Sequence, residues 1–589
     1  MRAENTRAVR RLTATSIALL LAAGLASATA FATPTTARIG LGSGPASGPY
    51  VRLERVCARA ESGSSSCLAL RSVPVAKTTA GAEPDLAVAN GGRGPAGGFT
   101  PRQIASMYQI DNTAATTQTI AIVDAYNDPY ARWELNVFDR HYGLPPETSR
   151  SLRKVNQRGH TTWFPPDHSG WAGEIALDLQ AVRGVCTKCR ILLVEADSNS
   201  NADLAAAVNT GVRLGAGVIS NSYGAPEGYS GRAVQAAYNH RGVVITASTG
   251  DDGWYGWDRA NGPNYSEDRP NAPAAYPGVV AVGGTTLSMR PDGTRSETVW
   301  NGNGRDDSYG LRQGPRGASG GGCSFRFLAP AWQSAVAGYG SLGCFGRRMV
   351  GDVAAVANPN TGYAVYGHYF GGWARVGGTS LSSPIIAAMY GLVGGGHAVA
   401  YPAKTLYDNA TYRPGLSYDV IAGGNAFCGG DVAASCTRSV QADFNGRRNP
   451  NNLGAGLVDC SYAYDGTANL RTRNKQCNAT RGFDGPSGVG TPAGLKMFRR
   501  ISPYLAITVP GSARVGSAVA AHAAASDPLT GEHITSYTWQ WGDDSAPVSG
   551  AALTTAMHTW RHAGSYRVTV AVRDSLGQYA STASTIRIS

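Results

Sequence analysis

The sequence predicts an α/β domain with a mostly parallel sheet flanked by helices, followed by a small β-sandwich. Residues 243–253 are a β-branched run that ends in small residues and then in Asp251, as at the carboxyl end of a buried strand. An apolar run that begins at Pro384 is typical of a buried helix. From about residue 501 the pattern changes to short alternating strands separated by turns, which indicates a separate β domain.

Residues 1–32 have the features of a secretory signal peptide. Several arginines precede an apolar stretch at residues 17–26, and Ala30-Phe-Ala32 supplies an A-x-A cleavage site. No other uninterrupted apolar stretch in the sequence is long enough to span a bilayer. We therefore expect a secreted, extracellular protein that does not use a membrane anchor.

Residues 33–98 are rich in glycine, alanine, serine and proline and end in a glycine-rich stretch. This composition predicts a flexible linker or a short propeptide that is removed by processing. We place the processing site near Gly98, where the pattern of a folded domain begins. The peptidase-like region then extends over residues 99–500, and the β-sandwich over residues 501–589.

The chain has ten cysteines, and an even number in an exported chain favours disulfides. The pair Cys186-Thr-Lys-Cys189 resembles a redox or zinc motif, but there is no second Cys-x-x-Cys, and export favours a short structural disulfide. Sequence-local pairing predicts five disulfides: Cys57/Cys67, Cys186/Cys189, Cys323/Cys344, Cys428/Cys436 and Cys460/Cys477.

The chemistry of the chain centres on Ser380 and on a pair of carboxylates. Ser380 follows two glycines and a threonine just before the apolar helical run. Glu174 and Asp178 are four residues apart, which puts them on one face of a predicted helix whose other residues are mostly apolar. A serine hydroxyl is a weak nucleophile unless a base accepts its proton. Together these residues predict a serine peptidase whose base is Glu174, oriented by Asp178.

Asp251 follows a predicted strand at the edge of the sheet where active sites of α/β proteins are built. It could belong to an ordinary Gly-Asp turn. The functional interpretation is a carboxyl group that stays protonated and donates a hydrogen bond to the oxyanion of the reaction.

These motifs, in this order, resemble the sedolisins, the serine-carboxyl peptidases whose fold is related to that of subtilisin. The sedolisin motif Gly-Thr-Ser-x-x-x-Pro is matched from Gly378 to Pro384, and the Glu and Asp four residues apart by Glu174 and Asp178. The resemblance covers roughly residues 99–500. It implies a subtilisin-like fold, a catalytic triad of Ser380, Glu174 and Asp178, and Asp251 as the oxyanion stabiliser. It also implies peptide hydrolysis in acid, which we expect at about pH 3–5, because a carboxyl base has a pKa near 4.

A subtilisin-type triad with a histidine base is the nearest alternative. Asp124 ends a strand-like run much as the subtilisin aspartate does, but none of the ten histidines begins a helix in a His-Gly-Thr motif. His160 and His168 lie in a polar, proline-rich stretch and are expected to be loop residues. We therefore assign Asp124 no catalytic role.

A structural calcium ion is expected near the end of the peptidase region. Asp419 and Asp484 stand in glycine-rich loops, and carboxylates with backbone carbonyls suit this hard cation. Two ordinary turns are the alternative from spacing alone. The sedolisin resemblance implies one Ca²⁺, held by the side chains or carbonyls of Asp419, Val420, Thr480, Gly482 and Asp484. Thr480 stands where the family commonly has glycine, but a carbonyl ligand does not depend on the side chain.

The C-terminal residues resemble a PKD domain, an Ig-like module often appended to secreted hydrolases. The resemblance rests on Trp541-Gly-Asp543, His558-Thr-Trp560 and the long strand pattern from Gly564. Whether this domain contacts substrate or an extracellular surface, and whether its tryptophans are core or contact residues, stays open at the level of sequence.

The formal net charge is +12, which could suggest nucleic-acid binding. Charged residues make up only 16% of the chain and form no Lys/Arg cluster beyond the signal peptide, so we exclude nucleic acid as a partner. We expect a monomer that acts on protein or peptide substrates. An inactive peptidase scaffold that binds through its PKD-type domain is the non-enzymatic alternative, and the intact catalytic positions argue against it.

Overall fold

The fold is taken from a computed structural model of the 589-residue chain. The predicted signal peptide and the pairs Cys428/Cys436 and Cys460/Cys477 involve residues outside its described part. The structure describes residues 50–77, 79, 83–85, 91–228, 230–256, 269–290, 292–302, 317–396, 399–426, 474–500, 502–527, 533–575 and 579–589.

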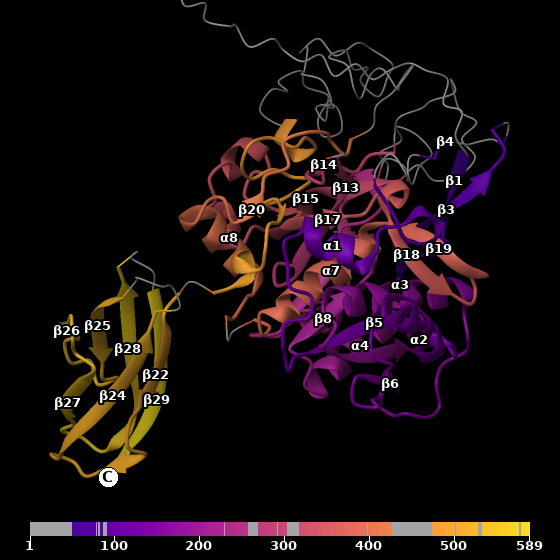
Figure 1. The fold of residues 1–589 in the computed structure, drawn as a ribbon. Coiled ribbons are helices and arrows are strands. Elements are labelled where there is room, and N and C mark those ends of the chain that lie inside the picture. The colour runs from indigo at the N-terminus through magenta and orange to yellow at the C-terminus, as the bar shows by residue number, and fades with distance from the viewer. Residues whose placement is uncertain are drawn as a thin grey trace, which may run out of the picture. The chain divides into compact units, whose positions relative to one another are not determined.

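The peptidase region is built on an eight-stranded sheet (Figure 1). The strand order is β14-β13-β10-β8-β5-β7-β6, with β17 also paired to β13, and every pair is parallel except β13 with β14. The predicted mostly parallel sheet is confirmed. Its strands are β5 (Thr119–Ala125), β6 (Leu152–Asn156), β7 (Arg190–Ala196), β8 (Val218–Asn221), β10 (Val244–Ser248), β13 (Val280–Met289), β14 (Arg295–Val299) and β17 (Val353–Val356).

Helices cover both faces of this sheet because successive side chains of a buried strand point to opposite sides. In β5, Ile120 and Ile122 join one hydrophobic core, and Ala121 and Val123 join the other. Helices α3 (Ser169–Val185) and α7 (Thr379–Leu392) pack against each other over the first face, while α4 (Asn201–Arg213) covers the second. The other described helices are α1 (Pro101–Met107), α2 (Ala131–Tyr142), α5 (Arg232–Ala237), α6 (Ala331–Ser334) and α8 (Ala403–Tyr412).

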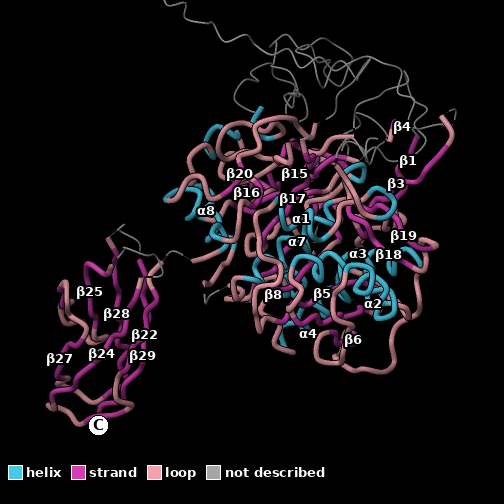
Figure 2. The backbone as a smooth tube through the Cα atoms, in the orientation of Figure 1, coloured by secondary structure: helices cyan, strands magenta, loops and turns pink. Residues whose placement is uncertain are grey.

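The segment before the peptidase region differs from the flexible linker that its composition predicts. Strand β3 (Leu70–Val75) lies between β1 (Tyr50–Arg55) and β19 (Gly372–Gly377), and β19 pairs with β18 (Tyr363–Gly367). Strand β4 (Glu83–Pro84) completes this five-stranded sheet, beside the peptidase core in Figure 2. The strands β1 and β3 are local exceptions to the small-residue composition, because Val51, Leu53 and Leu70 are buried and the backbone of β3 pairs with β19 of the peptidase region.

Smaller sheets surround the main one. Strand β9 (Tyr223–Pro226) pairs with β2 (Ser66–Cys67) and β12 (Asn271–Ala272), and β15 (Ala318–Leu328) pairs with β11 (Asp252–Trp254) and β16 (Arg347–Val350). Strands β20 (Ser417–Tyr418) and β21 (Thr491–Pro492) form a two-stranded sheet. Three predicted disulfides are present: Cys57–Cys67, Cys186–Cys189 and Cys323–Cys344.

The C-terminal domain consists of two sheets, in agreement with the predicted β-sandwich. Trp539, Trp541 and Trp560 are at most 1% exposed and belong to its hydrophobic core, so these tryptophans are core residues. One sheet contains β22 (Tyr504–Thr508), β24 (Ala518–Ser526) and β27 (Thr555–Thr559). The other contains β23 (Ser512–Ala513), β25 (Ile534–Gln540), β26 (Val548–Gly550), β28 (Gly564–Asp574) and β29 (Tyr579–Ile588).

Among the helices described, none combines the length and the apolar composition needed to cross a bilayer.

Candidate active site

The nucleophile candidate, Ser380, is the second residue of helix α7. Gly378 forms the N-cap with φ of +95°, a left-handed conformation that favours glycine. A Cβ at Gly378 would lie 2.2 Å from the carbonyl oxygen of Leu68 and 2.5 Å from Oδ2 of Asp251. The glycine therefore lets two oxygen atoms approach the first turn of the helix. Ser380 lies two residues after Gly378, and its side chain is fully buried.

The hydroxyl of Ser380 lies between three groups. It donates a hydrogen bond of 3.1 Å to the carbonyl of Ser222 and accepts one of 3.1 Å from the backbone N–H of Leu68. The Ser380 hydroxyl also acts to lower the pKa of Glu174, although both carboxyl oxygens of Glu174 are without a hydrogen-bond partner among the described residues. Ser380 is therefore next to the predicted base.

Glu174 and Asp178 lie on one face of α3, as their spacing predicts, and both are fully buried. The hydroxyl of Ser222 donates to Oδ1 of Asp178 at 2.8 Å and to the carbonyl of Ser380 at 3.2 Å. Ser222 thus connects the carboxylate pair to the serine. Sequence reasoning did not identify Ser222 as a site residue, because a lone serine after a predicted strand carries no signal of its own.

Burial raises the pKa of Glu174 well above its usual value, and the charges of Asp178 and Asp124 raise it further. The pKa of Asp178 is also raised well above its usual value, first by burial and then by Asp124. Asp124, at the end of β5, is fully buried and so belongs to the electrostatic surroundings of the pair. Like charges at this spacing cannot all ionise in a buried site, so the carboxyl cluster retains protons that exposed carboxylates would lose.

Asp251 lies beyond the end of β10 and reaches the start of α7. Its Oδ1 accepts hydrogen bonds of 2.7 Å from both the backbone N–H and the hydroxyl of Thr379. Its Oδ2 is buried and has no hydrogen-bond partner within the described residues. Burial raises the pKa of Asp251 to about 7, although the Thr379 hydrogen bonds act in the opposite direction. Below that pH the free oxygen can carry a proton and donate it.

The two histidines considered as alternative bases have structural positions. His168 is the N-cap of α3, where its Nδ1 accepts a hydrogen bond of 3.2 Å from the N–H of Trp171. The backbone N–H of His160 donates to the side chain of Asn156. The hydrogen bonds of the Ser380 hydroxyl go to backbone groups of Leu68 and Ser222, and neither histidine takes part in them.

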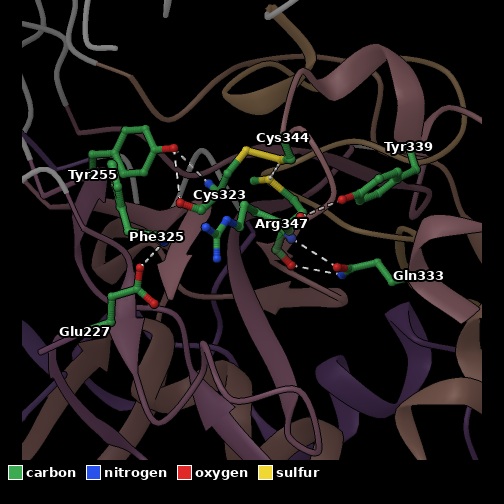
Figure 3. The surroundings of a disulfide bond; sticks show 9 residues. Glu227, Tyr255, Cys323, Phe325, Gln333, Tyr339, Cys344 and Arg347 are labelled. Atoms are coloured by element: carbon green, nitrogen blue, oxygen red, sulfur yellow. Dashed lines mark hydrogen bonds between the residues drawn. A yellow bond between two sulfur atoms is a disulfide. The ribbon is translucent and has the colours of Figure 1, made fainter. Parts of the chain in front are cut away.

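A cavity of about 820 Å³ opens beside the site and is lined in part by Leu68, Tyr255 and Glu227. Figure 3 shows two of the lining residues, Tyr255 and Glu227, near the disulfide between Cys323 and Cys344. The hydroxyl of Tyr255 accepts from the N–H of Cys323 at 3.0 Å, and Glu227 accepts from the N–H of Phe325. The aromatic residue Tyr255 lines this cavity, whereas Trp373 packs against Phe138 and Tyr142 of α2.

The five residues predicted to bind calcium lie in two facing loops, joined by a bridge between Gly424 and Asn478. The N–H of Gly482 donates to Oδ2 of Asp419 at 3.0 Å, and the N–H of Thr480 donates to Oδ2 of Asp484 at 2.8 Å. Asp484 is fully buried, as is Val420. Burial raises the pKa of Asp484 to about 8, and the charge of Asp419 adds to this effect. The two aspartates therefore come together.

Comparison with known proteins agrees with this fold and site. Residues 167–408 match the subtilase family, and residues 501–588 match the PKD domain. The chain therefore carries a subtilase-family domain and a PKD domain. The fold and the buried serine beside a carboxylate helix are similar to those of the serine-type peptidases of this family.

Within that class, the chain is similar to the sedolisins. Sedolisin from Pseudomonas sp. (strain 101) is 29% identical over 354 residues, 57% of this chain and 57% of that protein. Kumamolisin from Bacillus sp. (strain MN-32) is 30% identical over 343 residues, 56% of this chain and 57% of that protein. The chain thus spans somewhat more than half the length of these relatives.

A solved structure of Pseudomonas sedolisin, a serine-carboxyl proteinase in complex with two molecules of pseudo-iodotyrostatin, has a similar fold. The TM-score is 0.52 at 27% identity, and the similarity covers 69% of this chain and 98% of that chain. The predicted resemblance and the predicted subtilisin-like α/β fold are therefore confirmed.

Proposed function

We propose that this protein is a secreted serine-carboxyl endopeptidase that hydrolyses peptide bonds of proteins in acid. One observation carries the proposal: helix α3 with Glu174 packs against helix α7 with Ser380, and the unpartnered oxygen of Asp251 lies beside Gly378 at the start of α7. Acyl transfer needs a nucleophile, a base and an oxyanion stabiliser in this relation.

In the proposed mechanism, the Ser380 oxygen attacks the carbonyl carbon of a peptide while Glu174 accepts the hydroxyl proton. Glu174 then returns the proton to the leaving amine. In the second half of the reaction, Glu174 accepts a proton from water as the water attacks the acyl-enzyme, and then returns that proton to the Ser380 oxygen. Asp178, fixed by the Ser222 hydroxyl, orients Glu174 and shares its charge. The N–H of Ser380 and the protonated carboxyl of Asp251 stabilise the oxyanion.

Two sets of carboxyl groups determine the pH range of this mechanism, and only Asp251 favours acid. Asp251 must be protonated to donate, and its pKa of about 7 means that activity falls as the pH rises through 7. The cluster of Glu174, Asp178 and Asp124 must have lost a proton to provide a base, and its first ionisation sets the acidic limb. The resulting pH–rate profile is a bell whose alkaline limb belongs to Asp251.

We also propose one structural Ca²⁺ in the loops that carry Asp419 and Asp484, with carbonyl ligands from Val420, Thr480 and Gly482. A buried carboxyl with a raised pKa beside a second carboxylate fits a cation, because a positive charge would favour the ionised form of both. Bound there, the ion would supply structural cross-linking of two loops and no catalytic chemistry.

The proposed compartment and partners follow from the domain composition. The PKD domain and the similarity to sedolisins support an extracellular protein, and the signal peptide predicted for residues 1–32 supports secretion. The substrates are proteins or peptides, and we propose that the enzyme acts as a monomer whose PKD domain contacts substrate or an extracellular surface.

The test is the pH–rate profile of the purified protein on an unbiased peptide mixture, with Ser380→Ala as the blank. We expect serine-dependent cleavage with a maximum below pH 6. A maximum above pH 7 would contradict the carboxylate base. Absence of serine-dependent cleavage at every pH, from a protein whose N-terminal segment has been removed, would favour a binding protein on a peptidase scaffold.

A further inference from the structure

The chain places a segment of itself across the candidate active site. Strand β2 pairs antiparallel with β9, with Ser66 opposite Gly224 and Cys67 opposite Tyr223. Leu68, the next residue, donates its N–H to the carbonyl of Ser222 at 3.1 Å. The segment up to Leu68 is therefore bound as an added strand, which is how extended peptides bind to sheet edges.

The carbonyl of Leu68 occupies the position that the mechanism requires of a reacting carbonyl. It accepts a hydrogen bond of 3.2 Å from the N–H of Ser380. The carbonyl oxygen of Leu68 and Oδ2 of Asp251 both lie beside Gly378. A Cβ atom added to Gly378 would be 2.2 Å from the Leu68 oxygen and 2.5 Å from the Asp251 oxygen. The Ser380 hydroxyl is 3.1 Å from the N–H of the same residue. The nucleophile and the oxyanion donors thus converge on the backbone of one residue, Leu68, on its N–H and on its carbonyl respectively.

Beyond Leu68 the chain is held again. Leu70 begins β3, and it lies opposite Gly377 of β19, directly before the helix that carries Ser380. Leu68 and Ala69 therefore bridge two strand pairings, one on each side of the nucleophile. Both residues are at most 3% exposed.

Three further contacts hold the segment before the bridge. The disulfide Cys57–Cys67 closes a loop of the chain next to Leu68. Strand β1 pairs with β3 at six positions, from Tyr50 opposite Val75 to Arg55 opposite Leu70. Arg55 forms an ion pair with Asp252, the neighbour of Asp251. Because it is held by a disulfide, a strand pairing and an ion pair, this segment is an integral part of the folded domain.

We propose that the segment from Cys57 to Leu70 is a substrate-like ligand of the site, and that Leu68–Ala69 is the peptide bond that the enzyme cleaves in its own chain. This inference rests on the proposed peptidase function. It replaces the processing site near Gly98 that composition suggests, and it predicts that an apolar residue such as leucine is accepted before the scissile bond.

The step balances within the chain and one water molecule. The Ser380 oxygen bonds to the carbonyl carbon of Leu68, the bond from that carbon to the nitrogen of Ala69 breaks, and the nitrogen takes the proton held by Glu174. Water then releases Leu68 as a free carboxyl group and restores the serine. The products are a fragment that ends at Leu68 and an enzyme that begins at Ala69.

The experiment follows the full secreted chain after transfer from pH 8 to pH 4. Intact mass and N-terminal sequencing are measured under denaturing conditions, because β1 would keep the fragment paired with β3 after cleavage. The wild type should acquire Ala69 as an N-terminus with a rate independent of protein concentration, because the bond already lies in the site. Ser380→Ala should stay intact at this bond.

A matched pair of proline variants tests the position of the bond. Ala69→Pro makes the leaving nitrogen tertiary and restrains the backbone of Leu68, which should misplace the bond relative to Ser380, so cleavage at this bond should slow by at least about 100-fold. Ser62→Pro lies in the same loop, in a turn in which Ser64 donates to the carbonyl of Glu61 and Gly63 has φ of +87°. Proline suits that position, so this variant should cleave at the wild-type rate.

An added peptide separates failure of this inference from failure of the proposed function. If the wild type cleaves the peptide in a Ser380-dependent manner while Leu68–Ala69 stays intact, or if the new N-terminus lies near Gly98 with this bond uncut, the inference is wrong and the function stands. If a variant that lacks residues 33–68 cleaves no peptide at any pH, both the function and the inference fail.

Discussion

The interiors of the two domains differ in what they bury. Around the nucleophile, the peptidase domain encloses several carboxyl groups with no exposed surface, including Glu174, Asp178 and Asp251. The interior of the C-terminal sandwich is formed mainly by stacked tryptophans and β-branched side chains, such as Trp539 and Val570.

This difference in buried groups indicates that the interior of one domain serves function and the interior of the other serves stability. Burial of a carboxyl group opposes its ionisation and raises its pKa, which a domain that only needs to fold would avoid. Aromatic and β-branched side chains bury apolar area without that cost. The interior of the peptidase domain therefore contains groups that can exchange a proton, whereas the interior of the sandwich contains groups that stabilise the sandwich itself. Substitutions in the two interiors should have different consequences.

The largest effect on activity is expected from Glu174→Gln, which keeps the shape of the side chain and removes the base. Peptide cleavage should fall by roughly 10³–10⁴-fold, the usual contribution of a general base, with the fold retained by circular dichroism. Glu134→Gln is the matched control, since Glu134 of α2 is also buried and has a pKa raised to about 9. Full activity of Glu174→Gln would mean that buried carboxylates here are structural.

Asp251→Asn should lower the rate of cleavage by roughly 10²–10³-fold, as loss of an oxyanion donor does. The alkaline limb near pH 7 should also move, because it belongs to this group. Asp139→Asn is its control: burial raises the pKa of Asp139 to about 7 as well, but it lies on α2. An unchanged alkaline limb in the Asp251 variant would contradict its assignment.

The same group makes a prediction about stability. Because the pKa of Asp251 in the folded state is above its value of 3.8 in the unfolded chain, the folded state binds the proton more tightly. The stabilisation of the folded state by this protonated carboxyl is therefore complete below about pH 4 and is lost as the pH rises through about 7. The melting temperature of the peptidase domain should fall over that range, and less steeply in Asp251→Asn.

In the sandwich, Trp539→Ala should lower the free energy of unfolding by about 3–5 kcal/mol, as large-to-small substitutions in cores do. Cleavage of short peptides should be unchanged, because the site is in the other domain. Val548→Ala is the control, since Val548 is 43% exposed. Differential scanning calorimetry should show this loss of stability as a lower melting temperature for the unfolding transition of the sandwich. A parallel loss of peptide cleavage would mean that the two interiors are not independent.

The smallest effect is expected from removal of calcium. At a concentration 100 times its dissociation constant, one ion would stabilise the peptidase domain by about 2.7 kcal/mol, so a chelator should lower its melting temperature. Asp484→Asn should abolish this shift, and Asp543→Asn, in the sandwich, should preserve it. A chelator without effect on the wild type would contradict the calcium site.

Much of the site could be predicted because its residues are local in sequence. Glu174 and Asp178 share a helix face at a spacing of four, and the glycine before Thr379 starts the helix of the nucleophile. Ser222 could not be found in this way, since its hydroxyl gains a role only when β8, α3 and α7 meet. The strands at residues 50–55 and 70–75 were also missed, because a composition rich in small and polar residues conceals strands that depend on pairing with β19.

The sequence by itself determined the fold class and was enough to predict Ser380, the carboxylate pair and Asp251 as site residues, because residue type and short spacings carry that information. The tertiary structure decided two other properties. Burial, which depends on the whole domain, raises the pKa of Asp251 to about 7. The position of Leu68 against Ser380 joins residues 312 apart in the chain, and only the folded backbone can bring them together.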